Sequence, residues 1–84
     1  MNNRITVNEK VAITQLGFKK NLTTYPRQME FRGALYDFVD AGLSCLIHMG
    51  DKASQIVTVS DGSAFYRLKS DNHGGNWTLL SIAS

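Results

Sequence analysis

The chain has little that would cross-link it or anchor it. It contains one cysteine, Cys45, so no intramolecular disulfide can form, and a reducing cytoplasm is the expected compartment. No apolar run approaches the ~18 residues of a transmembrane helix. The N-terminal segment also lacks the apolar stretch of a signal peptide. We therefore expect a cytoplasmic protein without a membrane partner.

Motifs for metal and cofactor chemistry are missing as well. No C-x-x-C, H-x-x-H or H-E-x-x-H occurs, and neither do a phosphate loop, a dinucleotide fingerprint or a G-x-S-x-G turn. Cys45 and His48 are three residues apart and would face opposite sides of a strand, which disfavours a nucleophile–base pair. The aspartates stand where turns and strand ends would put them anyway. We expect no metal, no cofactor and no enzymatic activity.

The size and charge of the chain set further limits. Its 84 residues, 43% hydrophobic and 19% charged, fit one small folded domain over 1–84. The net charge is only +2, but residues 1–32 hold six basic against two acidic residues, and residues 33–84 hold three against five. A basic N-terminal third suits an anionic partner, although ordinary solubilising charge is the favoured explanation.

Residues 6–17 carry the signals of a short helix. Thr6 and Glu9 have the spacing of a capping box, and Gly17 stands where a helix C′ residue would, with two lysines just beyond. Four β-branched residues between these signals also suit strands, so RITV and VAIT strands are the alternative.

Residues 28–82 predict an antiparallel β meander. The clearest part is 54–82, where three strands are closed by hairpins at Asp61-Gly62 and at residues 71–75. An Asp-Gly pair favours a type I′ turn, which needs φ > 0 at both central positions. Upstream, shorter alternating segments predict weaker strands at 28–32, 35–40 and 43–49.

These elements predict a mainly β, small α+β fold. We expect five or six antiparallel strands in a strongly bent sheet, or a small SH3-like or OB-like barrel, with one short N-terminal helix. The last strand carries apolar residues on both faces. This pattern is typical of a central strand, or of one covered by another element such as the expected helix.

The middle strand of the final meander offers a candidate binding surface. Its alternation turns an aromatic and two basic side chains to one face, and basic and aromatic residues of the N-terminal third could extend that face. The predicted binding residues are Phe65, Arg67, Lys69, Arg32, Arg27 and Tyr25.

Two functions are compatible with this surface. The favoured one is protein–protein interaction, adaptor-like or inhibitor-like, or self-association as a homodimer, because a small sheet with a free edge and an exposed Phe65 or Leu46 would pair or pack. The alternative is nucleic-acid binding through the aromatic and basic sheet face. The pI of about 8.9 and the lack of an RNP-like aromatic pattern count against nucleic acid.

Overall fold

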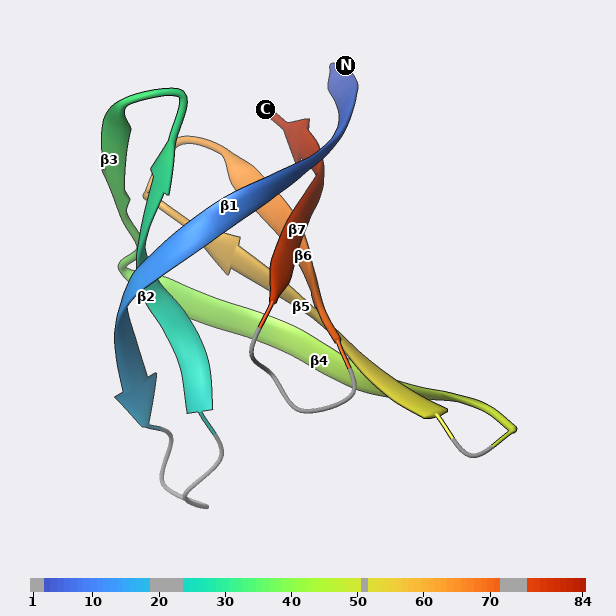
Figure 1. The fold of residues 1–84 in the computed structure, drawn as a ribbon. Coiled ribbons are helices and arrows are strands. Elements are labelled where there is room, and N and C mark those ends of the chain that lie inside the picture. The colour runs from blue at the N-terminus through green and yellow to red at the C-terminus, as the bar shows by residue number, and fades with distance from the viewer. Residues whose placement is uncertain (1–2, 19–23, 51, 72–75) are drawn as a thin grey trace.

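The computed structural model describes residues 3–18, 24–50, 52–71 and 76–84. Seven antiparallel strands form one sheet in the order β3-β2-β1-β7-β6-β5-β4 (Figure 1). The strands are β1 (Arg4–Phe18), β2 (Thr24–Phe31), β3 (Ala34–Asp37), β4 (Asp40–Met49), β5 (Lys52–Ser60), β6 (Phe65–Ser70) and β7 (Trp77–Ala83). The sheet is not closed, since β3 and β4 are its two ends. The described residues contain no helix.

The predicted helix over 6–17 is wrong, because this segment lies within the long strand β1. Val7, Val11 and Ile13 turn to the core with a period of two, not the period of a helix. Their branched side chains favour extended backbone and outweigh the capping signals.

The residues that imitated helix caps have other roles in β1. Thr6 and Glu9 flank a β-bulge, where Asn8 has a φ of 54° and the pairing with β7 shifts register. Gly17 is paired with Tyr25 of β2 and lies against its ring, and a Cβ at Gly17 would come within 2.5 Å of Tyr25 Cζ. The glycine is therefore explained by close packing of an aromatic ring and not by a helix end.

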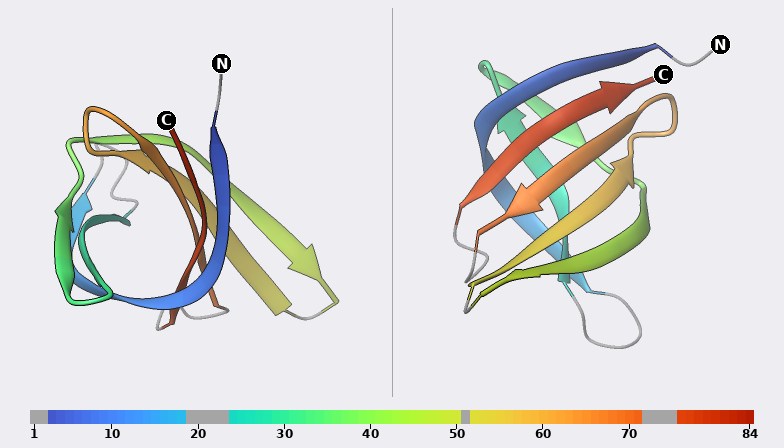
Figure 2. Two further views of the ribbon diagram at one scale, coloured as in Figure 1. Left: turned by 90° about the horizontal axis from the view of Figure 1, so that it is seen from above. Right: turned by 90° about the vertical axis from the view of Figure 1, so that its right-hand side faces the viewer.

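Strand β1 joins the two parts of the sheet. Its residues 4–11 pair with β7 and its residues 12–18 pair with β2. The two ends of the described chain consequently lie side by side, and the Ser84 amide donates to the Asn3 carbonyl at 3.1 Å (Figure 2).

Both predicted hairpins of the final meander are confirmed. Between β5 and β6, Gly62 has a φ of 99°, whereas Asp61 does not adopt positive φ. The Asp61 carboxylate instead accepts the amides of Ser63 and Ala64, each at 2.8 Å, so it acts as a side-chain turn acceptor. The second hairpin closes with Asp71 N donating to Asn76 O at 2.9 Å, and residues 72–75 lie outside the described residues.

Strand β7 is central, as its sequence predicts, being the fourth of seven. The register with β6 shifts between Arg67 and Leu68, so Leu80 is an extra residue in β7. This bulge reverses the alternation and brings Ile82 to the core side together with Leu79. The apolar residues on both faces therefore reflect a bulge and not a covering helix.

The core lies on the inner side of the sheet. The buried core residues are Met29, Phe31, Phe38, Val57, Val59, Tyr66, Leu68, Trp77 and Leu79. The Tyr66 ring of β6 contacts Tyr36 of β3 and Phe38, with centroid distances of 5.8 and 5.2 Å. Rings from distant positions in the strand order thus meet across the interior.

Two consecutive residues, Phe38 and Val39, carry the chain across the open side of the sheet. The Phe38 amide donates to Arg27 O of β2, and the next amide, of Val39, donates to Ser60 O of β5, both at 2.8 Å. The two ends of the sheet are therefore bridged covalently at 38–39, although β3 and β4 do not pair.

Candidate functional site

Strand β6 alternates strictly between the two sides of the sheet. Phe65, Arg67 and Lys69 are exposed, whereas Tyr66, Leu68 and Ser70 are buried. The Phe65 side chain keeps 56% of its surface exposed, which is unusual for a large aromatic residue. The orientation expected for the three residues is confirmed, and their role in binding stays a prediction.

The strand register extends this face over three neighbouring strands. Residues paired directly across antiparallel strands project to the same side. Three rows therefore cross β1, β7, β6 and β5: Arg4–Ala83–Phe65–Ser60, Thr6–Ser81–Arg67–Thr58 and Lys10–Thr78–Lys69–Ile56. We call these twelve positions the outer basic face.

The outer basic face combines positive charge with hydroxyl groups. Four of its positions are cationic, five carry hydroxyls, three are apolar and none is a carboxylate. Carboxylates occur at its borders, because Asp40 of β4 pairs with Ser60 and Asp71 follows the end of β6. Within the described residues, no cation of this face lies within ion-pair distance of a carboxylate.

Two of these cations, Arg4 and Lys10, are absent from the set predicted from the sequence. Arg4 and Lys10 lie about sixty residues from Phe65 and Lys69 along the chain, and only the pairing of β1 with β7 brings them to the same face. A strand assignment for residues 4–11 would have indicated that Arg4 and Lys10 point outward, but not toward which neighbour.

The structure separates the other three predicted residues from β6. Tyr25 and Arg27 lie on β2, and Arg32 lies in the turn that follows, with β1 and β7 between β2 and β6 in the sheet. Tyr25 is half-buried against Gly17, whereas Arg27 is exposed. The six predicted residues therefore form two groups and not one continuous surface.

Arg32 is engaged within the chain. Its guanidinium donates to the Glu9 carboxylate and lies 4.9 Å from the centre of the Phe31 ring. The hydrogen bond from Arg32 and the charge of Glu9 raise the pKa of Arg32 above its usual value. Arg32 and Gly33 have φ of 53° and 79°, the combination of a type I′ hairpin turn. This arginine is therefore explained as part of the β2–β3 hairpin.

The inner side of β6 is held by a hydrogen-bonded aspartate. Tyr66 Oη donates to Asp61 Oδ2 at 2.7 Å, in addition to the two amides that the carboxylate accepts. The hydrogen bonds from the backbone and from Tyr66 lower the pKa of Asp61, while burial and the neighbouring carboxylate raise the pKa of Tyr66. These shifted groups serve the turn between β5 and β6.

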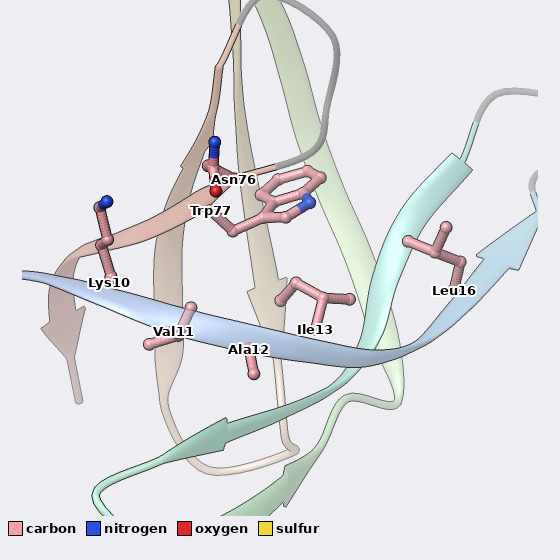
Figure 3. Close-up of a pocket in the computed structure, with 7 residues that line it drawn as sticks. All are labelled: Lys10, Val11, Ala12, Ile13, Leu16, Asn76 and Trp77. Carbon is pink, nitrogen blue, oxygen red and sulfur yellow. The ribbon is translucent and has the colours of Figure 1, made fainter.

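A hollow of about 340 Å³ lies where β1 leaves β7 to continue beside β2. Figure 3 shows the Trp77 indole near Ile13, with Lys10 farther along β1. Trp77 is only 7% exposed and belongs to the core. Among the described residues that line the hollow, Lys10 alone is ionisable, so no acid–base pair is assembled there.

The described residues contain no group of three potential metal ligands. The side chains of Cys45 and His48 in β4 lie outside this description. No helix long and apolar enough to cross a bilayer occurs in the described ranges. No family model matches the chain, and no curated protein and no solved structure is significantly similar to it.

Proposed function

We propose that the protein is a small non-enzymatic module that works by protein–protein interaction, adaptor-like, inhibitor-like or self-associating, through its edge strand β4. The observation that carries this proposal is the position of β4 at the end of the sheet, with a strand neighbour, β5, on one side only. An edge strand offers a row of N–H and C=O groups to an added strand.

The length and composition of β4 support this use. Natural edge strands are usually short or blunted by lysine, proline or a bulge. Strand β4 has ten residues, Asp40–Met49, with neither lysine nor proline. Its register shift lies between Ala41 and Ser44, which leaves Ser44–Met49 as a regular edge.

The hairpin of β4 and β5 also reaches beyond the rest of the sheet. Strand β5 pairs with β4 from Lys52 onward, but its described pairing with β6 begins only at Gln55. Figure 1 shows this end of the hairpin projecting away from β6 and β7. A partner strand could therefore reach β4 without meeting the body of the protein.

A second copy of the chain is the partner that we propose. Two β4 strands can pair antiparallel about a twofold axis, because such an interface is self-complementary. Size-exclusion chromatography with light scattering should then give twice the 9.3 kDa chain mass. A monomer at every concentration tested would refute the proposal.

A pair of proline variants tests the edge itself. Of two consecutive strand residues, one N–H points to the neighbouring strand and the other to the free edge. Of Leu46→Pro and Ile47→Pro, one therefore removes a bond to β5 and lowers the thermal midpoint. The other should lose the dimer and, at concentrations too low for dimer formation, keep the thermal midpoint of the wild-type monomer. A dimer that survives in that stable variant would contradict pairing through β4.

We add two proposals, one on the cellular compartment and one on the architecture of the sheet. We propose a cytoplasmic setting because Cys45 is the sole cysteine. We also propose that the open sheet is a small barrel interrupted along one line, supported by the ring contacts of Tyr66 with Tyr36 and Phe38. Its strands neighbour one another as in an up-and-down meander, so an OB-like Greek key has less support than an SH3-like arrangement.

A further inference from the structure

The outer basic face carries charge that no described residue neutralises through an ion pair. Arg32, by contrast, has Glu9 as its partner. Arg4, Lys10, Arg67 and Lys69 are all exposed and make no ion pair among the described residues. Four uncompensated cations on one side of a protein with a net charge of only +2 create a local field much stronger than the net charge indicates.

The spacing of these cations suits an extended polyanion. Arg67 and Lys69 are two residues apart on β6, which separates their Cα atoms by about 6.7 Å. Lys10 and Lys69 flank Thr78 of β7, so their strands are about 10 Å apart. The more accessible hydroxyl residues of this face, such as Thr78 and Thr6, can donate to phosphate oxygens without adding charge.

The exposed ring of Phe65 favours one class of polyanion. Phe65 lies in its row between Ser60 and Ala83, whose small side chains leave the ring uncovered. An aromatic side chain beside cations on a sheet is the arrangement that stacks a base of a single strand, whereas the bases of a duplex are already stacked on one another. A uniform phosphate polymer or an acidic peptide would make no use of this ring.

We propose that the outer basic face binds single-stranded nucleic acid, with Phe65 stacking one base and Arg4, Lys10, Arg67 and Lys69 contacting phosphates. This surface is separate from the β4 edge, so dimer formation and nucleic-acid binding can fail independently. With one aromatic residue and no base-reading side chain, the binding should tolerate any sequence.

The number of cations predicts the salt dependence. Each neutralised phosphate contributes about −0.7 to the slope of log K against log salt for a single strand, so four give about −2.8. The affinity should then fall about 50-fold between 50 and 200 mM salt. Fluorescence anisotropy with a labelled oligo-dT, and with a duplex of equal length, measures this directly.

Variants separate the two kinds of contact. Lys10→Ala and Arg67→Ala should each flatten the salt slope by about 0.7. Phe65→Ala should weaken binding about 5- to 150-fold and leave the slope unchanged. Matched controls are Arg27→Ala, an exposed cation on β2, and Leu35→Ala, an exposed apolar residue on β3, and neither should alter binding.

Three outcomes would overturn the inference. The first is no binding to oligo-dT at low salt. The second is an Arg27→Ala effect as large as that of Arg67→Ala, which would indicate attraction by net charge alone. The third is equal affinity for single strand and duplex together with an unaffected Phe65→Ala variant, which would assign the face to polyanions in general. Circular dichroism of each variant verifies that the fold is retained.

Discussion

Removing the Asp61 carboxylate should destabilise the hairpin of β5 and β6 strongly. In the structure this side chain accepts the amides of Ser63 and Ala64 and the hydroxyl of Tyr66, at 2.7–2.8 Å. The two amide bonds resemble those of an aspartate at a helix N-cap, the loss of which costs about 1 kcal/mol. The Tyr66 hydroxyl belongs to a residue only 5% exposed, and leaving it without a partner costs about 1 kcal/mol more.

Asp61→Ala should therefore lower the free energy of unfolding by about 2 kcal/mol. For a domain of this size that corresponds to a fall in the thermal midpoint of about 8–16 °C. Circular dichroism melts measure the midpoint, and urea titration measures the free energy.

A double-mutant cycle with Tyr66→Phe isolates the Tyr66–Asp61 bond. Tyr66→Phe keeps the ring and its packing while it removes the hydroxyl, so Asp61→Ala should cost only about 1 kcal/mol in that background. A coupling free energy of zero, or a melting midpoint for Asp61→Ala equal to that of the wild type, would refute the reasoning.

The same hydrogen bonds predict a dependence on pH. Folding lowers the pKa of Asp61, so this carboxylate contributes its full stabilisation above the unfolded pKa of about 3.9. That stabilisation is lost as the pH falls through the folded pKa. The urea midpoint of Asp61→Asn should therefore fall less than the urea midpoint of the wild type in this acid range. Folding raises the pKa of Tyr66, so the wild type should lose stability as the pH rises above about 10, and Tyr66→Phe should lose less. In either pH range, stability curves of variant and wild type that run parallel would contradict these assignments. Gly17→Ala should lower the free energy of unfolding by about 1–3 kcal/mol, measured by chemical denaturation, because the added Cβ would collide with the Tyr25 ring. An equal loss in a Tyr25→Ala background would rule out that collision.

The elements that the sequence predicts well are those specified by adjacent residues. The hairpin at Asp61 and Gly62 and the alternation of Phe65, Arg67 and Lys69 are both local, and both are present. The turn geometry itself differs from the prediction, because Asp61 closes the turn with its side chain and does not adopt positive φ. Local signals thus located the turn but did not determine its hydrogen bonds.

The errors and omissions arise from contacts between distant parts of the chain. Thr6, Glu9 and Gly17 match the pattern of helix caps, yet the pairing of β1 with both β7 and β2 imposes an extended conformation. The same long-range pairing brings Lys10 beside Lys69, with Thr78 between them. No local pattern contains that information, so half of the cations of the outer basic face could not be assigned from the sequence.

The pairing of β1 with β7 also governs how the chain must fold. Every other strand pair joins consecutive strands, whereas this one closes a loop of about seventy residues. Closing such a loop costs roughly 1.7 kcal/mol more entropy than closing one of ten residues. The sub-sheets β1–β3 and β4–β7 can form early from local contacts, and their joining is the slow step. Until then the unpaired edges of β1 and β7, which also carry apolar side chains, are open to other chains. The two strands that end at the centre of the sheet are therefore the sites most vulnerable to aggregation during folding.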